Sequence, residues 1–259
     1  MQETTTVLRA LPQLRRYHLE PVSVGKSASS VYRLVQPGMP ALFLKVSTVE
    51  DAAALKLESD CLEWLATKTS VPGVLQSGTA GQSAYLLTEA LPGSSASDAP
   101  RDLWERIAAQ IAGRLRQLHA VDVEECPFDR TLDRVIPLAA GRASSGLADE
   151  LDFDSERLGC NAIDLLDSLY RQRPGSEDIV VTHGDPCLPN IIFEGGAFTG
   201  FVDCGRCGRA DRYQDLALAH RSIESNFGKS LAGAFLSAYG LEYVDTMKLS
   251  YYRLLDEFF

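Results

Sequence analysis

Alternating hydrophobic and polar positions predict that the first ninety residues are rich in strands. Three segments that alternate or carry β-branched residues are separated by turn-forming stretches, Gly25–Ser29 and Gln36–Gly38, which is the pattern of an antiparallel meander. Two more strands are expected after Val71–Gly73. The five predicted strands cover residues 19–24, 30–35, 41–46, 74–77 and 84–88. Between the two groups, residues 51–67 repeat leucine at helical spacing, and Glu58 falls on the same apolar face, where a carboxylate needs a partner.

The pattern turns helical beyond Leu91–Ser95, whose Pro, Gly and Ser residues indicate a linker between two lobes. The predicted helices cover residues 104–118, 160–173, 212–225, 229–239 and 246–256. In the second of these helices the apolar stripe consists of Ile163, Leu166, Leu169 and Tyr170. A short strand is predicted at 179–182, and a hairpin is predicted around Gly195-Gly196, with arms at 191–194 and 197–202.

The composition is that of a globular protein. Of the 259 residues, 45% are hydrophobic and 23% are charged, which excludes the disordered and fibrous classes. The longest apolar runs are strand-sized, far below the roughly 20 residues that span a bilayer. The first residues lack the pattern of a signal peptide, so we expect a cytoplasmic protein. The six cysteines are expected to be reduced, and the lone CxxC at Cys204–Cys207, without a second pair, does not predict a zinc site.

The net charge of −10 argues against nucleic acid as a partner, because phosphate contacts need clustered Lys and Arg. The charge is uneven: residues 1–148 hold 15 basic and 16 acidic side chains, whereas residues 149–259 hold 10 and 19. Solubility is the more frequent reason for an acidic surface. A surface in the second half that binds a cationic ligand is the alternative.

A set of chemically active residue types lies between the strand at 179–182 and the helix at 212–225. The step of five residues from Asp185 to Asn190 matches the step from Asp to Asn in the catalytic loop of protein kinases, and Asp203 follows where a kinase places a metal-binding Asp. Phosphoryl transfer needs hard oxygen ligands for Mg²⁺ and a carboxylate that positions the acceptor hydroxyl and takes its proton. Taken alone, Asp185 and Asn190 are explained equally well as turn-stabilising residues.

Two residues of the strand-rich region favour the kinase interpretation. Lys45 ends the third predicted strand and Glu58 lies on the next helix, which is the arrangement of the kinase strand Lys and its helix Glu. The loop Gly25–Ser30 contains Gly-Lys-Ser, but Glu20 stands where a Walker A motif requires a glycine. As the turn between the first two strands, its small residues predict a phosphate contact, although the G-x-G-x-x-G pattern of protein kinases is absent.

Several longer runs carry more information than these single motifs. They are Gly25–Leu34, Trp64–Ala66, Cys126–Asp129, Val180–Ile191, Gly200–Arg206 with Ala210–Asp215, and Tyr252–Phe259. Together they resemble the aminoglycoside 3′-phosphotransferases, the kanamycin and neomycin kinases among them, over almost the whole chain. The resemblance implies an α+β, eukaryotic protein-kinase-like two-lobed fold. Residues 1–90 would form a nucleotide-binding lobe with an antiparallel sheet and a helix, and residues 91–259 a larger, mostly helical catalytic and aminoglycoside-binding lobe.

The resemblance also implies the reaction and the residues that perform it. The γ-phosphate of ATP, with GTP possible, would pass to the 3′-hydroxyl of an aminoglycoside antibiotic and make a bacterium resistant. Asp185 would be the catalytic carboxylate, with Asn190 and Asp203 as ligands of Mg²⁺. The residues implied at the nucleotide are Ser27 in the phosphate loop, Lys45 on the α- and β-phosphates, Glu58 orienting Lys45, and Glu89 and Ala90 beside adenine. The residues implied at the drug are Asp154, Asp256, Glu257 and the carboxylate of Phe259, with Arg206 and Arg221 tying the carboxylates in place.

The expected partner is thus an aminoglycoside, with neither nucleic acid nor a membrane, bound by a monomer or weak dimer. The charge of the second half is then interpreted mainly as a binding surface for a polycation. Ser155, Ser222 and Ser225 stand where relatives carry acidic residues, which predicts a narrower or weaker drug range and leaves the preferred drug open. A kinase for a macrolide, choline or homoserine is an alternative that the acidic C-terminus opposes. A nucleotide-binding pseudokinase is an alternative that the complete catalytic set opposes.

Overall fold

The computed structural model describes residues 2–22 and 29–259, which group by their contacts into two compact units. The first unit runs to Ala99 and includes Pro189–Arg206, and the second combines Pro100–Leu188 with Cys207–Phe259. These bounds differ from the predicted division at residue 90, because the first unit extends past the expected linker and takes in a later hairpin. The assignment of nucleotide and drug to separate lobes stays a prediction.

A five-stranded antiparallel sheet forms the body of the first unit, with the strand order β1-β2-β3-β5-β4. Its strands are β1 His18–Val22, β2 Ser30–Val35, β3 Leu42–Thr48, β4 Val74–Ala80 and β5 Ser83–Glu89. The predicted meander and the two later strands are therefore confirmed. Strand β5 lies inside the sheet, and residues 83–88 are buried whichever face they point to.

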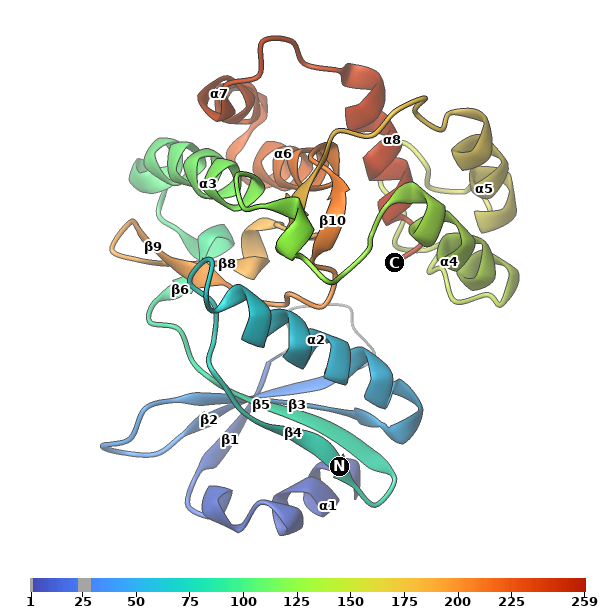
Figure 1. The fold of residues 1–259 in the computed structure, drawn as a ribbon. Helices are drawn as coiled ribbons and strands as arrows, with labels where there is room; N and C mark the ends of the chain where they lie inside the picture. The colour runs from blue at the N-terminus through green and yellow to red at the C-terminus, as the bar shows by residue number, and fades with distance from the viewer. Residues whose placement is uncertain (1, 23–28) are drawn as a thin grey trace. The chain divides into compact units, whose positions relative to one another are not determined.

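One helix covers each face of this sheet (Figure 1). Helix α1 (Gln2–Ala10), which the sequence pattern did not predict, contacts β3, β4 and β5, and α2 (Ala52–Leu65) contacts β4 and β5. Side chains alternate between the two faces of a strand. Leu44 of β3 accordingly belongs to the apolar core on the side of α1, whereas its neighbour Lys45 reaches Glu58 of α2.

A hairpin of β8 (Ile191–Glu194) and β9 (Ala197–Phe201) belongs to the first unit because β8 pairs with β6 (Ser94–Ser95). The predicted turn is confirmed: Gly195 and Gly196 have positive φ angles of 56° and 76°, as a two-residue type I′ turn requires. The hairpin ends shortly before Asp203, so the pairing register of β8 and β9 determines the position of the Asp203 carboxylate.

The second unit is mostly helical. Its helices are α3 Trp104–His119, α4 Leu132–Ser144, α5 Ala162–Arg171, α6 Tyr213–Phe227, α7 Lys229–Tyr239 and α8 Thr246–Asp256. Strands β7 (Ile179–Thr182) and β10 (Gly208–Asp211) form a two-stranded antiparallel sheet. Helix α6 contacts α3, α7 and α8, and most of its residues are buried. In the two units together, short 3₁₀ helices occupy Pro12–Leu14, Val49–Asp51, Ala96–Asp98, Arg101–Leu103, Val123–Glu125 and Leu188–Asn190.

Three features of the second unit differ from the sequence prediction. Strand β10 and helix α4 were not predicted, and α4 carries Pro137 in its interior, a residue that normally argues against a helix. The expected apolar stripe of α5 was wrong in part, since Ile163 and Tyr170 are 51% and 53% exposed while Leu165 and Leu169 are buried. The α+β composition itself is confirmed. None of the described helices is long and apolar enough to cross a membrane.

Candidate active site

Lys45 is held between two carboxylates of the first unit. Its Nζ lies 2.6 Å from Oε1 of Glu58 and 2.8 Å from Oδ1 of Asp203. The side chains of Lys45 and Glu58 are only 20% and 9% exposed. Burial alone would lower the pKa of Lys45, but the charges of Glu58 and then Asp203 outweigh it and raise that pKa. Lys45 therefore stays protonated, with its charge directed by two fixed partners.

The backbone is strained where it presents Asp203. The φ angle of this residue is 60°, the sole positive value among the non-glycine residues that the structure describes. Aspartate tolerates this left-handed region better than most residues, yet such a conformation still costs about 1–3 kcal/mol and is typical of functional sites. Two residues later, a Cβ on Gly205 would lie 3.4 Å from Cβ of Glu58, so the segment after β9 runs close to α2.

The backbone brings the two predicted metal ligands, Asn190 and Asp203, near each other at the base of the β8–β9 hairpin. The backbone N–H of Val202 donates to the carbonyl oxygen of Asn190 at 2.9 Å, which places Asn190 beside the residue that precedes Asp203. No group of three or more His, Cys, Asp or Glu side chains among residues 2–22 and 29–259 is arranged to hold a metal. The pair instead offers one amide and one carboxylate oxygen, a small hard donor set of the kind used for Mg²⁺ that keeps phosphate and water ligands.

The remaining residues predicted at the nucleotide are Ser27, Glu89 and Ala90. Ser27 lies outside the described residues. At the end of β5, the N–H of Glu89 donates to the carbonyl of Gly73 at 2.9 Å, and the N–H of Ala90 donates to that of Ala41 at 3.1 Å. Both donors are thus engaged by the sheet and its flank, so an adenine contact of Ala90 would have to use its carbonyl oxygen.

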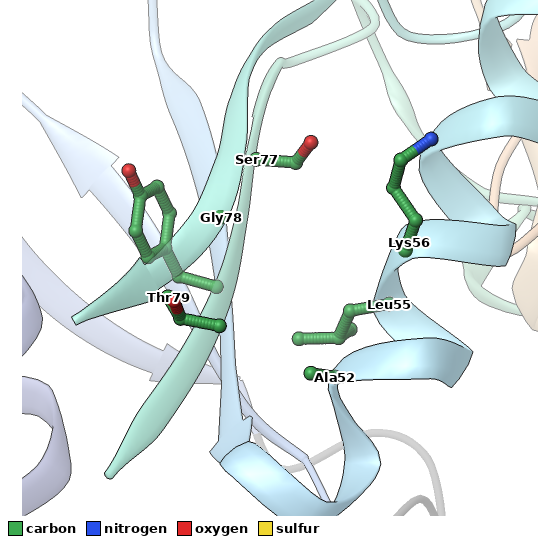
Figure 2. Close-up of a pocket in the computed structure, with 7 residues that line it drawn as sticks. Ala52, Leu55, Lys56, Ser77, Gly78 and Thr79 are labelled. Atoms are coloured by element: carbon green, nitrogen blue, oxygen red, sulfur yellow. The ribbon is translucent and has the colours of Figure 1, made fainter. Parts of the chain in front are cut away.

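A surface pocket of about 290 Å³ opens between α2 and β4 in the first unit (Figure 2). Its lining residues are Ala52, Leu55, Lys56, Ser77, Gly78, Thr79 and Tyr85. None of the predicted nucleotide-binding residues lines it. This pocket is therefore distinct from the set around Lys45.

In the second unit, the loop that carries Asp185 is fixed to the start of α6. Asp215 is fully buried and accepts hydrogen bonds from the N–H groups of His183 and Gly184, both at 2.8 Å. Gln214 Nε2 donates to the carbonyl of Gly184 at 3.0 Å. The N–H of Asp185 lies 3.2 Å from Nδ1 of His183, so this histidine helps to organise the loop. Both the N–H groups and a carbonyl group of the main chain immediately before Asp185 are thus hydrogen-bonded to α6.

A network of hydrogen-bonded side chains also contacts Asp215. His119 Nε2 lies 3.0 Å from Oδ2 of Asp215, and His119 Nδ1 lies 2.7 Å from the hydroxyl of Tyr239. Arg212 Nη1 donates to the same hydroxyl at 3.2 Å. Neither Asp215 nor His119 was given a role from the sequence, because an acidic residue in the first turn of a helix and a histidine in the last turn have ordinary helix-terminal explanations. Helices α3, α6 and α7 converge on this point.

Arg221 of α6 joins two of the residues predicted at the drug. Its Nη1 lies 3.2 Å from Oδ2 of Asp154, and its Nη2 lies 2.5 Å from Oδ2 of Asp256. Burial alone would lower the pKa of Arg221, but the charges around it, Asp256 first, raise it. The predicted role of Arg221 in tying carboxylates together matches these contacts.

Glu257 completes what we call the acidic set, which consists of Asp154, Asp256 and Glu257. Both oxygens of Glu257 accept from the N–H of Asp154, at 3.2 and 3.1 Å, and Oε1 also accepts from Arg157 at 3.1 Å. Burial, followed by the charge of Asp154, raises the pKa of Glu257. Arg157, which the sequence pattern did not single out, lies three residues after Asp154, a spacing that brings side chains together on one turn.

Other predicted drug-side residues lie in different surroundings. The Phe259 ring is partly exposed, and the guanidinium of Arg142 lies 5.8 Å from its centre. Arg206 belongs to the first unit, not to the second with the acidic set, and its tie to those carboxylates stays a prediction. Ser222, expected at a drug-facing position, is buried instead, and its hydroxyl accepts from the N–H of Leu188.

The predicted residues are thus brought together within each unit. The first unit gathers Lys45, Glu58, Asn190 and Asp203. The second unit gathers Asp154, Arg221, Asp256 and Glu257, and it also anchors the loop of Asp185.

Comparison with known proteins gives a consistent picture. Residues 18–252 match a family model described as the phosphotransferase enzyme family. An aminoglycoside 3′-phosphotransferase of Streptomyces ribosidificus is 41% identical over 266 residues, which cover 98% of this chain and 99% of that protein.

Solved structures extend the comparison to the fold. The crystal structure of an aminoglycoside 3′-phosphotransferase of type VIII superposes with a TM-score of 0.91 at 40% identity, over 99% of both chains. A Streptomyces rimosus aminoglycoside phosphotransferase in complex with ADP and streptomycin gives a TM-score of 0.86 at 27% identity, over 100% of this chain and 98% of that one. The predicted protein-kinase-like fold is confirmed.

Proposed function

This chain belongs to the phosphotransferase enzyme family, and we propose that it transfers the γ-phosphate of ATP to the 3′-hydroxyl of an aminoglycoside antibiotic. The observation that carries the proposal is Lys45, a partly buried cation held 2.6 and 2.8 Å from two carboxylates on different elements. A side chain fixed in this way is suited to bind the phosphates of a nucleotide without losing entropy on binding.

On the nucleotide side, Lys45 would contact the α- and β-phosphates and Glu58 would keep it in place. Asn190 and Asp203 would hold Mg²⁺, which neutralises phosphate charge when it is bound. Asp203 would then exchange part of its contact with Lys45 for the ion, a change that leaves Lys45 bound to Glu58. GTP in place of ATP is compatible with these residues, since none of them contacts the base.

Asp185 would act on the acceptor. The 3′-hydroxyl oxygen forms a bond to the γ-phosphorus while the bond from that phosphorus to the β–γ bridging oxygen breaks, and ADP leaves. The carboxylate of Asp185 orients the hydroxyl and takes its proton. The hydrogen bonds that Asp215 accepts from, and Gln214 donates to, the residues just before Asp185 support this role, because they restrict where the carboxylate of Asp185 can lie.

The acidic set supports an aminoglycoside as the acceptor. Aminoglycosides carry several ammonium groups, which bind carboxylates by charge-assisted hydrogen bonds. Transfer to the 3′ position is favoured by relatives: the identity is 41% and 40% with two 3′-phosphotransferases but 27% with the streptomycin-bound enzyme. A macrolide, choline or homoserine kinase would need fewer such carboxylates.

Steady-state assays of ADP release test the proposal. Kanamycin and neomycin should be phosphorylated, whereas a kanamycin analogue that lacks the 3′-hydroxyl, a macrolide, choline and homoserine should not. ATP and GTP are compared with each accepted drug, and NMR of the product locates the phosphate. Absence of turnover with every aminoglycoside would refute the proposal, and equal turnover of the deoxy analogue would refute the 3′ assignment.

Two variants assign the mechanism. Asp185→Ala should abolish turnover while nucleotide binding remains measurable by calorimetry. Asp167→Ala, at an exposed position on α5, serves as the matched control and should retain turnover. Full activity of Asp185→Ala would contradict the role of this carboxylate.

We also propose that the enzyme works as a monomer or weak dimer in the cytoplasm, where ATP is abundant. Analytical ultracentrifugation and fractionation of a drug-resistant host measure both properties. A stable higher oligomer, or activity confined to the periplasm, would contradict them.

A further inference from the structure

The loop around Asp185 is held by α6 at two points. Asp215 holds the residues just before Asp185, as described above. Farther along, the hydroxyl of Ser222 accepts a hydrogen bond from the N–H of Leu188 at 2.9 Å. Residues 215 and 222 are seven positions apart, about two helical turns, so both anchors face the same side of α6.

The surroundings of Ser222 favour this contact. It is 8% exposed, and Leu188 is completely buried. The carbonyl oxygen of Ser222 accepts from Nδ2 of Asn226, which fixes the last part of α6 locally. A buried hydroxyl that accepts from a main-chain N–H is a structural tie, not a ligand for a drug ammonium.

Only Asp185, Pro186 and Cys187 lie between the two anchored ends of the loop. With both ends tied, the catalytic carboxylate has few positions open to it. If the tie at Leu188 is lost, the buried N–H loses the hydroxyl of Ser222 as an acceptor and the segment can shift. A misplacement of about 1 Å can reduce a reaction rate by about a hundredfold.

The same turn of α6 also carries the contact to the drug-side carboxylates. Arg221, next to Ser222, binds Asp154 and Asp256, while Ser222 binds the loop of Asp185. Adjacent residues of one helix therefore connect the acceptor-binding carboxylates with the catalytic carboxylate. A substitution of Ser222 should accordingly alter the position of Asp185.

We propose that Ser222 is a positioning residue that sets the catalytic rate by fixing the loop of Asp185, and not a drug-binding position that has lost its carboxylate. This inference rests on the proposed function, in which Asp185 accepts the proton of the acceptor hydroxyl. It changes the expectation for the drug range, because serine at 222 then removes no contact to the drug.

The kinetic test separates kcat from KM. Ser222→Ala removes the acceptor, and we expect kcat to fall about tenfold, with KM for ATP and kanamycin within about twofold of wild type. Ser222→Thr keeps a hydroxyl and should restore most of kcat. Ser237→Ala on α7 is the matched control, since its hydroxyl only bonds to the carbonyl of Gly233 within its own helix.

Two outcomes of these assays would overturn the proposal. One is an unchanged kcat in Ser222→Ala despite a lowered melting temperature, which would make the serine merely structural. The other is a Ser222→Asp variant whose KM for kanamycin falls at unchanged kcat, which would make position 222 drug-facing. If Ser222→Ala does not fold, Ser222→Cys preserves the volume with a weaker acceptor and should show the same loss of kcat.

Amide hydrogen exchange measured by NMR tests the tie without any substrate. In Ser222→Ala the Leu188 amide should exchange at least about tenfold faster, while the amides of His183 and Gly184, which Asp215 holds, keep their rates. Unchanged exchange at Leu188 would refute the anchor. The exchange rate does not depend on turnover. An inactive wild-type enzyme would therefore refute the proposed function, whereas the exchange rate of the Leu188 amide would still show whether Ser222 holds the loop.

Discussion

Asp215 should contribute more than any other side chain to fixing the loop that carries Asp185. The substitution Asp215→Asn tests this prediction. Its Oδ2 accepts from the N–H of His183 and lies 3.0 Å from His119 Nε2, and its Oδ1 accepts from the N–H of Gly184. Asparagine retains one oxygen. If that oxygen replaces Oδ2, the amide NH₂ faces the N–H of Gly184 across the present 2.8 Å, and donor meets donor.

The cost follows from burial, since Asp215 has no exposed surface. A buried N–H left without an acceptor costs about 1–3 kcal/mol, and hydrogen bonds to an ionised acceptor contribute about 1.5–3 kcal/mol each. One unpaired N–H and one lost hydrogen bond together cost about 2.5–6 kcal/mol. We expect the second unit to lose about 3–5 kcal/mol of unfolding free energy, and kcat to fall at least about tenfold through the displaced loop.

Tryptophan fluorescence during urea unfolding measures this loss in the correct unit. The chain has two tryptophans, and Trp104 stacks on Phe227 of α6 at 4.8 Å between ring centres. A Trp64→Phe background therefore leaves Trp104 as the reporter of the second unit. Asp178→Asn is the matched control, because its carboxylate is 55% exposed and an exposed ion pair contributes at most about 1 kcal/mol. An Asp215→Asn enzyme within about 1 kcal/mol of wild type with normal kcat would refute the reasoning.

Three further outcomes follow from single contacts. Gly93→Ala should prevent folding of the first unit, because φ is 104° and a Cβ would lie 2.1 Å from the carbonyl oxygen of Phe193; a soluble variant with wild-type circular dichroism would contradict this. Arg221→Ala should raise KM for kanamycin about tenfold with KM for ATP unchanged, since its two carboxylate partners lose their position; a lower KM would mean that the arginine competes with the drug. Burial raises the pKa of Tyr251 to about 12, and its hydroxyl has no hydrogen-bond partner among the described residues. The unfolded chain loses this proton near pH 10, so stability must fall as the pH rises from 10 to 12, and Tyr251→Phe should recover about 1 kcal/mol at pH 11; identical alkaline unfolding curves would refute the assignment.

Local patterns in the sequence were sufficient for elements whose signal is local. The turn at Gly195-Gly196 specifies its hairpin, and alternation specifies the strands of the first unit. Helix α4 escaped prediction because Pro137 interrupts its pattern, while packing of α4 on α5 stabilises it. Ile163 and Tyr170 were misplaced because a helix of ten residues admits more than one apolar stripe, and contacts with α4 and α8 select the one that is buried.

The same distinction applies to the candidate site. The spacing from Asp185 to Asn190 and Asp203 is a local signal, and it was enough to predict the catalytic residue and the metal ligands. The anchors of that loop are not local: Asp215 bonds to residues about thirty positions earlier, and Ser222 bonds to Leu188 across 34 positions. A single serine or aspartate in a helix has many ordinary explanations, so only the folded chain reveals which backbone donor it meets.

The acidic set also changes how the net charge of the chain is understood. Its three carboxylates are bound by two guanidinium groups, those of Arg157 and Arg221, so the acidic set together with these two arginines carries a formal net charge of −1. Of the 19 acidic side chains of residues 149–259, 16 lie outside this set, and the interpretation of that excess mainly as a drug-binding surface stays a prediction. Because the arginines hold the carboxylates in fixed directions, the set would, in the proposed function, distinguish ammonium groups by their position, whereas the wider negative surface would only attract cations in general. Selectivity among aminoglycosides should accordingly depend on the geometry around Arg221 more than on the number of acidic residues.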